Sequence, residues 1–225
     1  MTVKIIKGDA RSTGLPDKSV HCIATSPPYW GLRSYLQKDD PEKAQEIGAE
    51  PTPEAYVESM RAVGRECYRV LRDDGVMWIN LGDTYSSGGM SNPSAKSTLG
   101  GGKERGAKDY TIVRNVGNLP SGNIVGIPWR VAFALQADGW ILRAAIPWVK
   151  ANGMPESVTN RPTVAHEYVF LFAKAKWYFY DADAVRMGVS ASTTDRFGAE
   201  PSRIRPNGCP TQQAAIGFRG ESTCG

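Results

Sequence analysis

Apolar and polar positions in the first third of the chain predict a strand, a helix and a second strand. Residues 20–25 form an apolar run that stops at two prolines. Proline cannot donate a ladder hydrogen bond, so the chain must leave the sheet there. Thr52-Pro53 is typical of an N-cap followed by proline in the first helical turn. Behind it, apolar side chains recur at steps of four and three, as on the buried face of a helix: Tyr56, Met60, Val63, Cys67 and Val70.

A second apolar run, at residues 76–79, predicts a buried strand that follows a helix end at Asp73-Asp74-Gly75. A short β-branched run at residues 3–6 predicts another strand ahead of all these elements. Because strand, helix and strand alternate, we expect a parallel sheet in an α/β fold.

The later part of the chain predicts one more helix and three more strands. The helix is expected at residues 127–137, with Pro128 near its start and Gly139 just beyond its end. The strands are expected at residues 140–146, 167–173 and 177–180.

Composition narrows the class of protein without deciding its function. The 225 residues suffice for one well-cored domain, and no apolar run approaches the roughly 20 residues of a membrane span. The four cysteines lack the paired spacing of a zinc site, and with no secretory signal pattern we expect reduced thiols in a cytoplasmic protein. A net charge of +4 permits a polyanionic partner but does not require one.

A metal centre is not expected. His166-Glu167 is the pair that most suggests one, but it lacks the second histidine that zinc binding on one helix face needs. Its predicted strand also places neighbouring side chains on opposite faces.

The most informative segment is Thr25-Ser26-Pro27-Pro28-Tyr29-Trp30, directly after the strand at residues 20–25. An exocyclic amine on a nucleobase is a poor nucleophile, and accepting hydrogen bonds from both of its N–H groups draws the nitrogen toward tetrahedral geometry. The Ser26 hydroxyl can accept one and a backbone carbonyl of Ser26 or Pro27 the other, on a loop that the two prolines fix. Tyr29 and Trp30 offer flat faces for a base taken out of the duplex. The alternative interpretation is a proline turn that merely ends a strand.

This hexapeptide resembles the catalytic motif of DNA amino-methyltransferases, and its serine form is typical of members that modify cytosine N4. Further segments resemble other parts of the family in the order of the permuted class, whose catalytic motif precedes the main cofactor motif. The resemblance covers roughly residues 5 to 183. These segments are Gly8-Asp9-Ala10, the runs at residues 15–20, 76–83 and 127–130, Met154-Pro155-Glu156-Ser157, and residues 166–172.

The resemblance implies a Rossmann-like α/β sheet of an S-adenosylmethionine-dependent methyltransferase with a long loop insertion. Family members also carry a glycine loop that holds the methionine part of the cofactor, and this sequence has none, so an incomplete sheet is an alternative to a complete one. We accordingly divide the chain into four parts. They are the catalytic-motif half at residues 1–85, a basic Gly/Ser-rich insertion at 86–124, the rest of the α/β core at 125–182, and an irregular tail at 183–225 where a target-recognition region would start.

The resemblance also assigns site residues by type. The catalytic group comprises Ser26, Pro27, Pro28 and Tyr29. The residues implied to contact the cofactor, S-adenosylmethionine, are Asp9 and Thr25. The residues expected to contact DNA are Trp30, Arg33, Tyr35 and Lys150.

The function predicted from the sequence is methyl transfer from S-adenosylmethionine to cytosine N4 in double-stranded DNA, on a flipped base, as part of restriction–modification. Methylation of adenine N6 is one alternative, because the same loop geometry serves either amine. A second alternative is an inactive DNA-binding fragment or a half-enzyme that requires a complementary C-terminal half or second subunit. Neither a membrane nor a metal is expected to take part.

Overall fold

The computed structural model describes residues 2–32, 35–37, 39–86, 116, 119–153, 156 and 158–185. The chain divides into two compact units, residues 1–178 and residues 179–225. In the second unit the described structure is a short helix, α3 (Ala182–Val185). All elements discussed below belong to the first unit.

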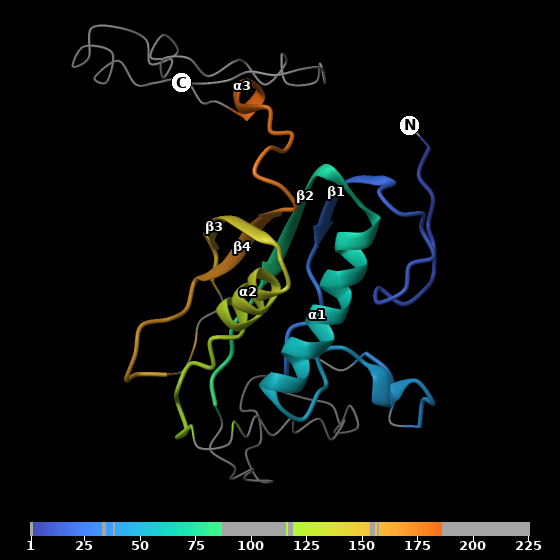
Figure 1. The fold of residues 1–225 in the computed structure, drawn as a ribbon. Coiled ribbons are helices and arrows are strands. Elements are labelled where there is room, and N and C mark those ends of the chain that lie inside the picture. The colour runs from blue at the N-terminus through green and yellow to red at the C-terminus, as the bar shows by residue number, and fades with distance from the viewer. Residues whose placement is uncertain are drawn as a thin grey trace, which may run out of the picture. The chain divides into compact units, whose positions relative to one another are not determined.

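A mixed four-stranded sheet forms the centre of the first unit (Figure 1). Its order is β1-β2-β4-β3, where β1 is Val20–Thr25, β2 is Leu71–Leu81, β3 is Ile141–Val149 and β4 is His166–Ala173. β1 and β2 pair in parallel, as the sequence predicts, whereas β4 is antiparallel to both β2 and β3. The expectation of a parallel sheet is therefore wrong for β4, which runs opposite to the other three strands. A loop, rather than a crossover helix, joins β3 to β4, and such a connection makes an antiparallel pair.

Helix α1 (Pro53–Val70) begins where the sequence predicts. Thr52 has extended backbone geometry, and its side chain accepts a hydrogen bond from the Ala55 N–H at 3.1 Å. This bond satisfies one of the N–H groups that the first turn leaves without an intrahelical partner. The apolar stripe predicted for this helix is the face that packs into the core.

Replacing Thr52 by alanine is expected to lower the free energy of unfolding by about 1 kcal/mol, because it removes the N-cap acceptor and leaves the rest of the turn intact. Urea unfolding measured by circular dichroism checks this. Thr52→Ser is the matched control, since it keeps the hydroxyl, and its midpoint should stay close to that of the parent. Equal stability of the alanine variant and the parent would contradict the assignment of the cap.

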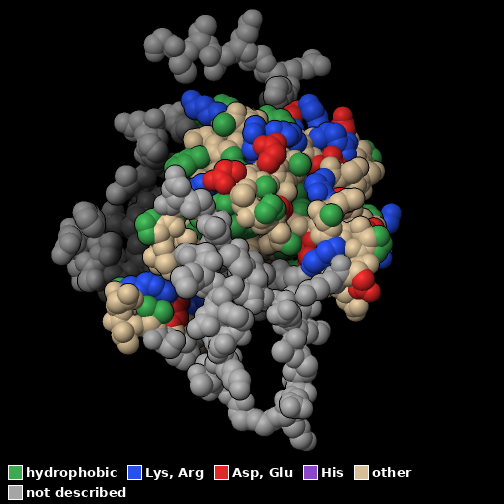
Figure 2. All heavy atoms as spheres, turned by 90° about the horizontal axis from the view of Figure 1, so that it is seen from below, with side chains coloured by type: hydrophobic (Ala, Val, Ile, Leu, Met, Phe, Trp, Pro, Cys, Tyr) green, Lys and Arg blue, Asp and Glu red, His purple; other side chains and the backbone are tan. Residues whose placement is uncertain are grey.

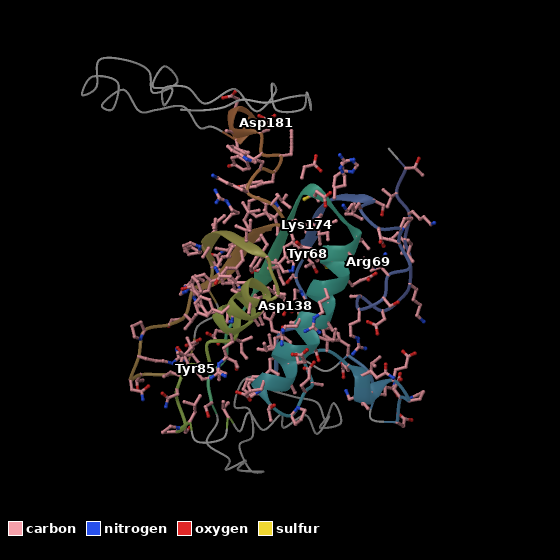
Figure 3. All side chains as sticks on the ribbon, viewed as in Figure 1. Tyr68, Arg69, Tyr85, Asp138, Lys174 and Asp181 are labelled. Carbon is pink, nitrogen blue, oxygen red and sulfur yellow. The ribbon has the colours of Figure 1, made fainter. Side chains whose placement is uncertain are left out.

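Helices α1 and α2 (Ile127–Ala137) lie side by side in front of the sheet in Figure 1 and enclose the core with it. Gly64 of α1 permits this close approach, because a Cβ atom there would lie 2.3 Å from Leu135 Cδ2. At the C-terminal end of α2, Asp138 accepts a hydrogen bond from Arg61 Nε of α1 at 3.0 Å (Figure 3). In the part of the chain that the structure describes, no helix is long and apolar enough to cross a membrane.

The sheet has a second face, which carries the other half of the alternating side chains. The register aligns Ala24 with Trp78 and pairs Asn80 with Val169, so these residues project away from α1 and α2. Along the edge strand β3, Trp148 lies on the same face and is 58% exposed. This face matters because the candidate site lies on it.

Two predicted strands are not formed, and β2 begins earlier than the sequence predicts. Residues 3–6 form no strand, and Val3 and Ile5 are 86% and 92% exposed, because no described strand pairs with them. Residues 177–180 also form no strand. β2 starts at Leu71 directly after α1, so Asp73-Asp74-Gly75 lies inside the strand rather than at a helix end.

The ends of the predicted insertion are held together. Ser86 N–H donates to the Asn123 carbonyl at 2.8 Å, and Val125 N–H donates to the Thr84 carbonyl at 2.9 Å. Most of the insertion, at residues 87–115, lies outside the described residues, as does the tail from residue 186 onward.

Candidate active site

The loop at residues 26–29 begins at the carboxyl end of β1. Thr25 is aligned with Ile79 of β2. The next residue, Ser26, therefore lies level with Asn80, on the sheet face that α1 and α2 do not cover. Ser26 is exposed. A hydroxyl is therefore available at the end of a central parallel pair of strands, the usual place for a ligand site in an open α/β sheet.

Two neighbours, Tyr56 and Gly48, brace the backbone of this loop. The Tyr56 hydroxyl of α1 donates to the Pro28 carbonyl at 2.9 Å, and Gly31 N–H donates to the Gly48 carbonyl at 2.8 Å. Gly48 has a φ of +96°, and a Cβ there would lie only 3.0 Å from Pro28 Cβ. Together with the fixed φ angles of the prolines, these contacts hold the loop in one shape before any substrate arrives.

The expectation that Trp30 stacks on a base is wrong for this structure. Its side chain is 2% exposed and belongs to the core cluster, and its Nε1–H donates to the Glu50 carbonyl at 2.9 Å. Trp30 therefore anchors the segment that follows the loop. Tyr29, which is only partly buried, remains the aromatic side chain at the site.

The Tyr29 ring is fixed at both ends. Beneath it lies Gly82, where a Cβ atom would approach Tyr29 Cε2 to 2.6 Å. At its tip, the Tyr29 hydroxyl donates to Glu167 Oε2 at 2.9 Å and accepts from Asn80 Nδ2 at 3.0 Å. Ser26 Oγ lies 3.5 Å from the same hydroxyl, at the outer limit of a hydrogen bond.

The ionisation states follow from these contacts. Partial burial, with the neighbouring Glu167 carboxylate, raises the pKa of Tyr29 to about 12, so its hydroxyl stays protonated near neutral pH. Burial alone would raise the pKa of Glu167, but hydrogen bonds from Lys150, Asn80 and Tyr29 outweigh it and hold this pKa below its usual value. The Lys150 ammonium forms an ion pair with Glu167 Oε1. A protonated phenol thus donates to a carboxylate that a lysine neutralises.

The comparisons with known proteins agree with this architecture. The profile of the N6/N4 methyltransferase family, described as DNA methylase, matches residues 20–208. The chain belongs to this family.

Curated relatives of this chain are type II methyltransferases. The chain is 42% identical over 196 residues to M.SmaI of Serratia marcescens, an alignment that covers 86% of this chain and 63% of that protein. It is 44% identical over 186 residues to M.XycI of Xanthomonas campestris pv. cyanopsidis, covering 81% of this chain and 58% of that protein. The chain therefore spans about three fifths of the length of these relatives.

A solved structure shares the fold. The PvuII DNA methyltransferase (cytosine-N4-specific) superposes with a TM-score of 0.52 at 15% identity, over 88% of this chain and 64% of that chain. This confirms the Rossmann-like α/β methyltransferase sheet that the sequence resemblance implies.

Two residues that sequence reasoning did not assign to the site, Asn80 and Glu167, are the hydrogen-bond partners of the Tyr29 hydroxyl. Both lie in segments that the family resemblance covers, at residues 76–83 and 166–172, but the resemblance gave them no role. They come from β2 and β4 and meet Tyr29 only through strand register. A further sequence signal is a polar side chain within or next to an apolar run: Asn80 lies between Ile79 and Leu81, and Glu167 directly precedes the run at residues 168–173.

Asp83, which follows Asn80 on the same segment, is a helix cap. One of its carboxylate oxygens accepts from the N–H groups of Gly126 and Ile127, each at 3.0 Å. Burial raises the pKa of Asp83, although these backbone donors oppose the shift. Gly126 has a φ of +77° and no capping side chain of its own, so Asp83 fixes the start of α2.

The described residues fit S-adenosylmethionine only in part. Arg11 donates to both carboxylate oxygens of Asp9, with Nη2–Oδ2 at 2.7 Å, and lowers the pKa of Asp9, so Arg11 occupies part of the acceptor capacity that a cofactor contact at Asp9 would use. Thr25 is the last residue of β1 and is half-buried beside Ser26. Within the described ranges, no strand leads into the glycine loop that family members use for the methionine part.

The structure describes two of the other residues expected to contact DNA, Tyr35 and Lys150, and both are exposed. Tyr35 is 64% exposed, and its N–H donates to the Glu46 carboxylate. Lys150 is half-exposed and bonded to Glu167, so its charge is directed into the site. Arg33 lies outside the described residues. Basic and acidic side chains lie interspersed on the face shown in Figure 2.

Proposed function

We propose that this chain takes part in the S-adenosylmethionine-dependent methylation of cytosine N4 in double-stranded DNA, on a base flipped out of the duplex. The observation that carries the proposal is the exposed Ser26 hydroxyl on a Pro-Pro-Tyr loop that Tyr56, Gly48 and Gly82 brace. Because its relatives are type II methyltransferases, we place this activity in a restriction–modification setting.

The proposed chemistry makes the amine a better nucleophile. Ser26 Oγ accepts a hydrogen bond from one N–H of the target amine. The second acceptor is the carbonyl of Ser26 or Pro27, because the Pro28 carbonyl already accepts from Tyr56. Both acceptors are in place before the base arrives, so no loop ordering is needed during the reaction.

The Tyr29 ring supplies a surface on which the flipped base stacks. When bound, S-adenosylmethionine supplies an electrophilic methyl group on sulfur. Contacts of Asp9 and Thr25 with this cofactor remain part of the proposal.

Adenine N6 is the second candidate, because the matching family covers both amines. Ser26 favours cytosine through the resemblance of the serine motif to that of cytosine-N4 enzymes. A third candidate, a DNA-binding fragment or half-enzyme that requires a complementary polypeptide, is motivated by the lengths of the relatives.

Mass spectrometry of nucleosides separates these candidates. Duplex DNA is incubated with the purified chain and methyl-labelled S-adenosylmethionine, then digested. Label in N4-methylcytosine supports the proposal, and label in N6-methyladenine replaces cytosine by adenine. Absence of label in every nucleoside would contradict activity of this chain alone and favour the third candidate.

A further inference from the structure

Glu167 lies at the centre of a set of contacts on the sheet face that α1 and α2 do not cover. Its Oε2 accepts from the Tyr29 hydroxyl at 2.9 Å and from Asn80 Nδ2 at 3.0 Å, and its Oε1 is paired with Lys150. The donors come from the loop after β1, from β2 and from the residue after β3. Three segments far apart in the sequence therefore meet at one carboxylate.

We propose that Glu167 is a positioning residue, which holds the Tyr29 ring in the orientation that receives the target base. This inference rests on the function proposed above. Both oxygens of Glu167 are already engaged by protein donors, so the carboxylate acts through Tyr29 rather than on the amine. With Gly82 beneath the ring and Glu167 at its tip, Tyr29 cannot tilt without breaking a contact.

The orientation of Asn80 supports the same role. Its Nδ2 group donates both to Tyr29 and to Glu167. Its Oδ1 atom is buried and, among the residues that the structure describes, has no hydrogen-bond partner. Turning the amide over would place its oxygen against the carboxylate of Glu167, which would then lose the Asn80 donor. The amide thus leaves an acceptor unpaired and links the tyrosine to the carboxylate.

The Lys150 ammonium stabilises the charge of the partly buried Glu167 carboxylate. A carboxylate there without a counter-charge carries a desolvation cost, which an ion pair offsets. The same pairing means that a neutral amide at position 167 meets a lysine that has lost its partner. Neutralising both positions together removes that conflict and still leaves a hydrogen-bond acceptor for Tyr29.

The test therefore compares four variants of the full chain: Glu167→Ala, Glu167→Gln, Lys150→Met and the double variant Glu167→Gln/Lys150→Met. We expect kcat for labelled methyl transfer to fall about 10-fold in Glu167→Gln and further in Glu167→Ala, with KM for DNA changed less. At saturating DNA the double variant should recover kcat to within about 3-fold of the parent, because the glutamine oxygen still accepts from Tyr29, and loss of the DNA contact expected of Lys150 would raise KM instead. Glu58→Gln, which removes a carboxylate of α1 that pairs with Arg61, is the control and should match the parent.

Two outcomes would overturn the proposal. Parent-like activity of Glu167→Ala would show that Tyr29 needs no anchor. Failure of the double variant to exceed Glu167→Ala would show that the negative charge, rather than an acceptor for Tyr29, is required.

A second measurement keeps this inference separate from the proposed function. The chain is labelled with 3-fluorotyrosine, and Tyr29→Phe identifies the fluorine resonance of Tyr29. Glu167→Ala should move that resonance, and the double variant should return it toward the parent position. If the parent methylates no nucleoside, the proposed function fails for this chain and the fluorine result still decides the role of Glu167. A resonance unmoved in Glu167→Ala overturns that role.

Discussion

Replacing Ser26 by alanine is expected to lower kcat for methyl transfer by at least about 100-fold, comparable to the loss of one preorganised hydrogen-bonding group at an enzyme's reacting centre. The Ser26 hydroxyl is exposed at the end of β1, and in the proposed reaction it accepts an N–H of the target amine. That acceptance matters most in the transition state, where the nitrogen has given up conjugation with its ring. KM for DNA should therefore change little, because the hydroxyl contributes little to ground-state binding.

The measurement is the initial rate of label transfer at saturating DNA, together with a DNA titration for KM. Ser19→Ala is the matched control. Ser19 lies ahead of β1, where its hydroxyl donates to the Pro16 carbonyl at 2.7 Å, so its loss should leave both constants near those of the parent. Full activity of Ser26→Ala would mean that backbone carbonyls alone accept from the amine, and the assignment of Ser26 would be wrong.

Ser26 and its loop are predictable from sequence because their geometry is local. An apolar run must end where two prolines begin, and that places Ser26 at a strand end whatever else the chain does. The start of α1 is local in the same sense, since Thr52 and Pro53 specify a helix start without help from distant residues.

Glu167 could not be assigned in this way. Its contact with Tyr29 spans 138 positions in the sequence and exists because β4 inserts beside β2 in an antiparallel register. A shift of that register by one residue would turn Glu167 to the helix-covered face. The burial of Trp30 could not be predicted from the sequence either. Trp30 is buried whereas the neighbouring Tyr29 is partly exposed, and this difference depends on tertiary packing rather than on a short motif.

The wrong strand predictions have a related cause. β-branched and aromatic residues favour strands through the surfaces and neighbours that a sheet offers, rather than through an intrinsic backbone preference. Residues 3–6 have the composition of a strand but find no partner among the described residues, whereas residues 166–173 find partners on both sides.

Replacing Gly82 by alanine is expected to reduce kcat about 100-fold, although the position is distant in sequence from the catalytic loop. The new Cβ would lie 2.6 Å from Tyr29 Cε2 and 2.7 Å from Tyr29 Cδ2, closer than real Cβ contacts allow. The ring must move, and its hydroxyl is then carried away from Glu167 and Asn80. Misplacement of a positioning group by about 1 Å is enough for a loss of this size.

Labelled methyl transfer and thermal unfolding should be measured together for this variant. Overpacking costs about 1–3 kcal/mol of stability, so the chain should remain folded while activity falls. Gly8→Ala is the matched control, since a Cβ there has no heavy atom within 4 Å, and its activity should equal that of the parent. If Gly82→Ala kept full activity, a displaced ring would serve as well as the observed one, and the close packing of Tyr29 on β2 would have no part in catalysis. A loss in Gly82→Ala that matches the loss in Glu167→Ala would indicate that both changes act on the same ring, one from beneath it and one from its tip.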